Sequence, residues 1–89
     1  MKRLNIRVEG RVQGVFYRAF VQEVALQLNI RGFVQNEADG SVYIEAEGDD
    51  NDLQQLIARC RQGPPRAQVS NLSVEEAPPK QFSYFRISR

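Results

Sequence analysis

Histidine is absent from this 89-residue chain, and cysteine occurs only once. Without histidine, the Ser-His and Cys-His nucleophiles of many hydrolases are excluded, and so are the usual nitrogen ligands of zinc and iron. A single cysteine, Cys60, cannot form an intramolecular disulfide, so the sequence gives no sign of an oxidising compartment. We expect Cys60 to be a small core residue on a helix face.

Long apolar runs and a large net charge are also lacking. No apolar stretch approaches the roughly 18–20 residues of a membrane-spanning helix, and the N-terminus has no signal-peptide core. The net charge is +1, which excludes a general polycation. These absences predict a cytoplasmic protein without a membrane partner.

The charges that are present fall into blocks. Residues 1–36 carry six Lys/Arg and two Asp/Glu, residues 37–58 carry seven acids and no base, and residues 59–89 carry six bases and two acids. The simplest interpretation of the acidic block is a solvated face. Asp49, Asp50 and Asp52 within it fit the capping of a helix and lack the spacing of a calcium loop.

Apolar periodicity predicts five strands and two helices. Alternation indicates strands at residues 4–8, 30–35 and 42–47, and weaker patterns indicate strands at 69–74 and 82–87. Spacings of three and four residues indicate helices at 17–28, ending near Asn29, and at 53–60, closed by Gly63. This order predicts an α+β fold, a ferredoxin-like α/β sandwich with two helices on one face of a mostly antiparallel sheet. The last strand would join a sheet edge that the sequence does not identify.

A glycine loop joins the first strand to the first helix, in the segment Gly10-Arg11-Val12-Gln13-Gly14-Val15-Phe16-Tyr17-Arg18. A strand that turns into a helix leaves several backbone N–H groups unpaired near the positive end of the helix dipole, where an anion binds well. Arg18 could reach back over them with a planar charged group. The alternative is a tight connection in which the glycines serve only backbone freedom, with Arg18 as a solvated helix residue.

Asn36 lies at the end of the second strand. In the expected fold the first two strands run parallel with another strand between them, so their C-terminal ends share one sheet edge about 10 Å apart. Asn36 would then lie near the mouth of the glycine loop, where its amide could hold a water molecule. The alternative is ordinary turn chemistry, because Asp39-Gly40 follows closely.

A non-catalytic module that binds anions or RNA is a second function to consider. Residues 31–34 resemble a fragment of an RNA-binding motif that occurs on this general fold. The fragment falls on the second strand, however, and the third strand would expose Tyr43 beside Glu45 and Glu47, a poor surface for phosphates. We therefore expect no nucleic-acid partner.

Two segments of the sequence resemble the signature segments of the acylphosphatases. They are Gly10 to Arg18, quoted above, and Gly32-Phe33-Val34-Gln35-Asn36 continuing through Gly40 and Val42. The resemblance covers nearly the whole chain and implies one acylphosphatase-like domain over residues 1–89 with a ferredoxin-like fold. A chain that begins at Met1 and ends soon after its last strand favours a free-standing enzyme over a domain of a larger maturation enzyme.

The resemblance implies an enzyme that hydrolyses acyl phosphates to a carboxylate and inorganic phosphate. No metal ion or other cofactor is implied, and the expected partners are the acyl phosphate substrate and the phosphate product. Asn36 is implied to hold the attacking water. The phosphate is implied to be cradled by Arg18 together with the backbone of Val12, Gln13, Gly14, Val15, Phe16 and Tyr17. No apolar patch in the sequence demands a protein partner, so we expect a monomer.

Overall fold

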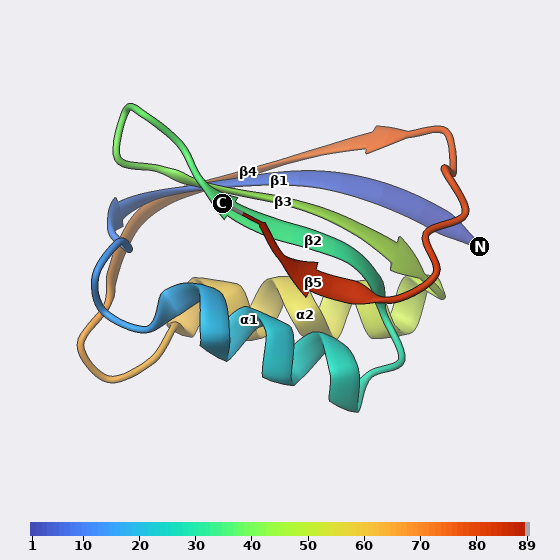
Figure 1. Cartoon of the computed structure of the whole chain (residues 1–89), viewed down its shortest axis with the longest axis horizontal. Coiled ribbons are helices and arrows are strands. Elements are labelled where there is room, and N and C mark those ends of the chain that lie inside the picture. The colour runs from blue at the N-terminus through green and yellow to red at the C-terminus, as the bar shows by residue number, and fades with distance from the viewer. Residues whose placement is uncertain (89) are drawn as a thin grey trace.

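A computed structural model describes residues 1–88 (Figure 1). Five strands form one sheet, and two helices pack against one of its faces, as predicted. Neither helix is long and apolar enough to cross a membrane, among the residues described. The elements in chain order are β1 (Lys2–Arg11), α1 (Tyr17–Gln27), β2 (Arg31–Asn36), β3 (Val42–Gly48), α2 (Asp50–Gln62), β4 (Gln68–Ala77) and β5 (Phe85–Ile87).

The order of strands across the sheet is β4-β1-β3-β2-β5. β3 lies between β1 and β2 and is antiparallel to both, so β1 and β2 run parallel to each other and end at the same edge. β4 is antiparallel to β1, whereas β5 is parallel to β2. The sheet is therefore mixed, with β5 supplying the one parallel pairing between described neighbours.

The core lies between the helices and the sheet. The side chains of the two helices that face the sheet are apolar and almost wholly buried, and Cys60 is one of them, as predicted. On the sheet, alternate residues of the central strands complete the core. Its members include Ile6, Val8, Val34, Ile44, Val21, Val24, Leu53 and Leu56.

Glycine and asparagine end the two helices as expected, because each lies in the left-handed region. Asn29 follows α1 with φ 57°, and Gly63 is the C-cap of α2 with φ 69°. The predicted capping at the other end of α2 is wrong in one respect. Asp49 occupies the N-cap position, but its side chain makes no capping hydrogen bond. The first-turn acids Asp50 and Asp52 favour the helix through their charge.

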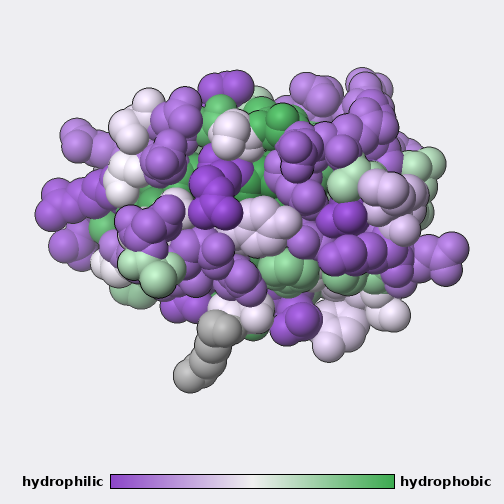
Figure 2. All heavy atoms as spheres, turned by 90° about the horizontal axis from the view of Figure 1, so that it is seen from above, coloured by the Kyte–Doolittle hydropathy of each residue, from purple (hydrophilic) through white to green (hydrophobic). Residues whose placement is uncertain are grey.

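The predicted solvated acidic face is wrong for Glu45 and Glu47, which are 7% and 1% exposed. Both lie on the sheet face opposite the helices, and the connection between β4 and β5 folds over them. Arg3 Nη1 and Lys80 Nζ lie 2.9 and 3.1 Å from Glu45 Oε1. Tyr43 donates its hydroxyl to Glu45 Oε2 at 2.7 Å. Hydrophilic side chains nevertheless cover most of this open face (Figure 2).

Glu47 holds the β4–β5 connection in place through backbone N–H groups. Its carboxylate accepts hydrogen bonds from the N–H of Lys80, of Gln81 at 2.9 Å and of Phe82 at 2.8 Å. Residues 80–82 use their N–H groups for these bonds and belong to no strand, and Gln81 has φ 59°. For this reason β5 begins at Phe85 and not at Phe82, where the sequence predicted it.

Burial by itself would raise the pKa of the Glu47 carboxyl. The N–H donors of Lys80, Phe82 and Gln81 outweigh burial and hold that pKa below its ordinary value of 4.5. Because the folded-state pKa is depressed, the ionised carboxyl stabilises the fold above the unfolded-state pKa. This stabilisation is lost as the pH falls from 4.5 through the folded-state pKa.

The substitution Glu47→Gln is therefore expected to lower the free energy of unfolding at pH 7 by about 2 kcal/mol, because a charged acceptor of three N–H groups is replaced by an amide. The difference from the wild type should shrink as the pH falls from 4.5 to 3. Urea denaturation at several pH values measures both effects. Glu75→Gln, an exposed change on β4, is the control and should alter stability by less than about 0.5 kcal/mol. A Glu47→Gln deficit that is the same at pH 7 and pH 3 would contradict this role for the carboxylate.

Candidate active site

The chain passes from β1 into α1 through residues 12–16, in a conformation that two left-handed residues create. Gly14 has φ 72°, and Phe16, at the N-cap position of α1, has φ 64°. A left-handed conformation costs a non-glycine residue roughly 1–2 kcal/mol. The Phe16 ring is 75% exposed, so burial of the ring does not offset this strain. Strain of this kind is typical of functional loops.

The loop and the first turn of α1 present a row of unpaired donors. Within residues 1–88, the backbone N–H groups from Gln13 to Ala19 donate to no protein acceptor, and the first bond of this region runs from Phe20 N to Phe16 O at 3.1 Å. The α1 N-terminus adds the positive end of its dipole to these groups. No acidic side chain occupies the first turn. The segment therefore offers donors and positive potential to an anion.

A hollow of about 300 Å³ lies beside these donors and brings together residues from three parts of the chain. Arg18 comes from α1, Asn36 from the end of β2 and Ile87 from β5. Asn36 lies beside the glycine loop, where the strand topology predicted it. The full lining is Val12, Gly14, Phe16, Tyr17, Arg18, Ala19, Asn36 and Ile87.

Asn36 has an unsatisfied side chain in this hollow. Its Oδ1 atom is buried and accepts no hydrogen bond from the described protein groups. Leaving a buried polar atom without a partner costs about 1–3 kcal/mol, so such atoms usually bind water or a ligand. Turn chemistry alone does not account for this atom, because the bonds of the following turn are made by other residues.

Arg18 is half-buried and is held at one end of its guanidinium group. Nη1 donates to the backbone oxygen of Ser88 at 3.1 Å, and Ser88 N in turn donates to Val34 O on β2 at 2.8 Å. The remaining guanidinium donors make no hydrogen bond within residues 1–88. Arg18 is thus oriented by the end of the sheet while most of its donors stay available.

Three other side chains of the loop segment are buried or hydrogen-bonded elsewhere in the protein. Tyr17 is 1% exposed and donates its hydroxyl to Cys60 O at 2.7 Å; burial raises its pKa well above the ordinary value. Val15 is buried, and Gln13 turns toward the β2–β3 connection. Tyr17 nevertheless lines the hollow, as do Val12 and Phe16. Neither Gln13 nor Val15 is among the residues lining the hollow.

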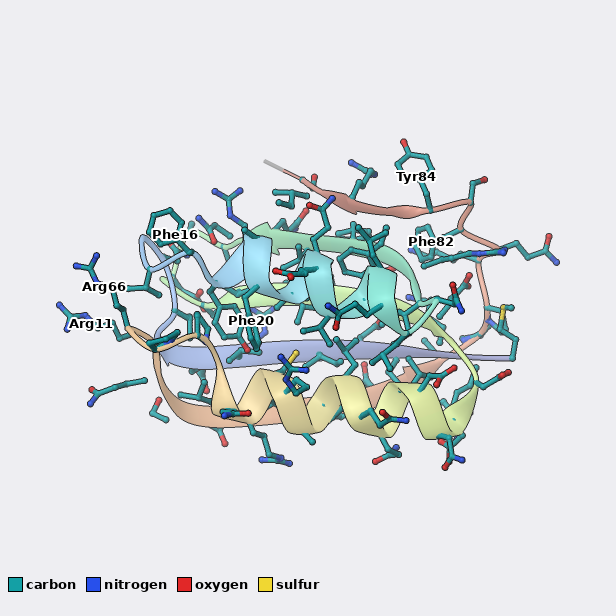
Figure 3. All side chains as sticks on the ribbon, turned by 90° about the horizontal axis from the view of Figure 1, so that it is seen from below. Arg11, Phe16, Phe20, Arg66, Phe82 and Tyr84 are labelled. Carbon is teal, nitrogen blue, oxygen red and sulfur yellow. The ribbon has the colours of Figure 1, made fainter. Side chains whose placement is uncertain are left out.

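Sequence reasoning missed several residues that border the site. Ala19 and Ile87 line the hollow, and Ser88 orients Arg18. Ile87 and Ser88 could not be predicted, because the sequence does not show which sheet edge the last strand joins. Arg11 and Arg66 line a second hollow that shares Gly14 with the first. Figure 3 shows both arginines and Phe16 projecting from the same end of the molecule. They add positive charge near the loop.

Metal ligands are not gathered anywhere in residues 1–88, where no three Asp, Glu, Cys or His side chains are close enough to share an ion. The donor set of the hollow is instead a guanidinium, an amide and backbone N–H groups. Such donors suit an oxyanion such as phosphate.

Comparisons with a family model, with protein sequences and with solved structures each match acylphosphatases. A family model described as acylphosphatase matches residues 4–87. An acylphosphatase from Thermotoga petrophila is 51% identical over 98% of this chain and 97% of its own length. One from Methylococcus capsulatus is 46% identical over 100% of this chain and 98% of its own. The crystal structure of acylphosphatase from Bacillus subtilis superposes with a TM-score of 0.98, at 39% identity and full coverage of both chains.

Proposed function

This chain belongs to the acylphosphatase family and hydrolyses acyl phosphates to a carboxylate and inorganic phosphate, and we propose that Arg18, Asn36 and the backbone of residues 12–18 carry out that reaction. One observation carries the proposal. The free guanidinium donors of Arg18, the unpartnered Oδ1 atom of Asn36 and most of the residues that carry unpaired N–H groups border one hollow.

The loop binds the phosphoryl group of the substrate. Its charge lies on oxygens that need several donors at once, and the N–H groups of the loop and of the α1 N-terminus supply them. Arg18 adds the positive charge that neutral N–H groups lack, through a planar group whose donors match phosphate oxygens. Because Ser88 already orients the guanidinium, little conformational entropy is lost on binding.

Asn36 holds the attacking water. Its Oδ1 accepts a hydrogen bond from that water and so directs the water oxygen toward phosphorus. The water oxygen forms a new P–O bond as the bond from phosphorus to the acyl oxygen breaks. The acyl carboxylate leaves with the bonding electrons, and an oxygen of the transferred phosphate takes the proton of the water.

The leaving group explains why neither histidine nor a metal ion is needed. A departing carboxylate has a conjugate acid with a pKa of about 4.3, like that of a glutamate side chain, so it leaves without being protonated. The protein has only to position the water and stabilise charge on the phosphoryl oxygens. We therefore propose a metal-independent reaction.

We also propose that residues 1–89 act as a monomeric, cytoplasmic domain that does not bind nucleic acid. The net charge of +1 and the mainly hydrophilic open face support this proposal. The RNA-like segment does not present bare rings, because Phe33 packs against Tyr43 and Phe82 and lies under Arg86.

The substitution Arg18→Ala is expected to abolish phosphate binding and to lower turnover by roughly 10³-fold or more, because the backbone cradle alone leaves the phosphoryl charge unmatched. Hydrolysis of benzoyl phosphate in the presence of EDTA, with phosphate as a competitive inhibitor, measures both. Arg61→Ala, on the exposed side of α2, is the matched control and should behave like the wild type. Near-normal turnover in folded Arg18→Ala would remove Arg18 from the site.

The substitution Asn36→Ala is expected to lower kcat by roughly 10²–10³-fold, the usual effect of losing one group that acts in the transition state. Inhibition by phosphate should persist, because Arg18 and the loop are intact. The same benzoyl phosphate assay separates the two effects, and Asn71→Ala on β4 is the control for the loss of an exposed asparagine. A weakened phosphate affinity with unchanged kcat would show that Asn36 binds phosphate and does not hold the water.

A further inference from the structure

We propose that the side chain of Gln13 is a positioning residue that fixes the distance between the phosphate loop and Asn36. The inference rests on the proposed function, because it assigns Gln13 the task of aligning the two parts of that site. It concerns the side chain alone, which bonds to Glu37 O and is not among the groups that line the hollow.

Gln13 bridges the loop to the connection between β2 and β3. Its Nε2 donates to Glu37 O and to Ser41 O, each at 2.9 Å. Both acceptors are carbonyl oxygens, so both N–H groups of the amide are used and the amide can adopt only one orientation. The side chain is half-buried, which shields these bonds from competing water.

The β2–β3 connection, to which Gln13 is bonded, is a turn closed by its own hydrogen bonds. Glu37 N donates to Ser41 O at 2.8 Å, and Gly40 N donates to Glu37 O at 3.1 Å. Asp39 Oδ1 accepts bonds from both the N–H and the hydroxyl of Ser41. The two carbonyl oxygens that bind Gln13 therefore also close the turn, and they cannot shift relative to each other without breaking it.

Asn36 is joined directly to this unit. It precedes Glu37 in the chain and pairs with Val42, which follows Ser41. A displacement of the turn relative to the loop would therefore carry the Asn36 amide with it. No other hydrogen bond within residues 1–88 joins residues 10–18 to residues 36–41. Arg18 is held separately, by Ser88 at the end of β5.

The division of contacts gives Gln13 a specific effect on catalysis. Phosphate binding depends on the loop and on Arg18, whereas attack depends on where Asn36 places the water relative to that phosphate. Loss of the Gln13 bridge should therefore leave phosphate binding intact and slow the attack by water. A misplacement of about 1 Å between reacting groups costs up to about 10²-fold in rate.

The test begins with Gln13→Met, which keeps the length of the side chain and removes its donors. We expect kcat for benzoyl phosphate to fall about tenfold or more, with phosphate inhibition within about threefold of the wild type. Gln13→Ala is the second variant, and circular dichroism sets an assay temperature at which each variant is folded. Gln35→Ala is the matched control: Gln35 also bonds to Glu37, through its side chain, but does not reach the loop. It should keep wild-type turnover.

A double variant, Gln13→Met with Asn36→Ala, separates positioning from general destabilisation. If Gln13 acts through Asn36, the double variant should be no more than about threefold slower than Asn36→Ala alone. Effects that multiply would overturn the proposal, as would wild-type kcat in Gln13→Met when Asn36→Ala is slow. Wild-type kcat in Asn36→Ala itself would overturn the proposed role of Asn36, and the positioning role of Gln13 with it.

Discussion

The row of unpaired N–H groups from Gln13 to Ala19 is the feature on which the rest of the site depends. It exists because β1 turns into α1 without a capping side chain, through left-handed residues at Gly14 and Phe16. The turn is strained and its donors are unsatisfied, so the surrounding structure has to hold it. Tyr17 does so from behind, through the buried bond from its hydroxyl to Cys60 O on α2.

The sheet supplies the second requirement, which is that Asn36 must meet this loop. β3 separates β1 from β2 and brings their C-terminal ends to one edge. On the open face, Arg3 forms an ion pair with Glu45, and Glu47 accepts hydrogen bonds from backbone N–H groups of the β4–β5 connection. This connection leads to β5 beside β2, after which Ser88 orients Arg18. The bonds around Glu45 and Glu47 thus affect the site indirectly, because they hold the segment that precedes β5 and Ser88.

Local pattern was enough to predict the element order, the helix ends at Asn29 and Gly63, and the meeting of Asn36 with the loop. Each of these features depends on periodicity, on a single backbone conformation or on topology.

The burial of Glu45 and Glu47 was not predictable, because alternation shows which face a side chain occupies and not what covers it. The partner of β5 and the bonds of the Gln13 side chain depend on long-range packing, which leaves no local signal. The roles of Arg18 and Asn36 remain proposals for experiment.

The central claim is that the N–H groups of this loop hold the phosphoryl group, and backbone NMR tests it most directly. Inorganic phosphate would be titrated into ¹⁵N-labelled protein while the amide shifts are followed. The account predicts that the largest shifts fall on residues 13–19, with downfield proton movement typical of new hydrogen bonds to an anion. They should saturate at the concentration that inhibits hydrolysis. Shifts that instead centre on the open sheet face, around Arg7 and Arg86, would contradict it.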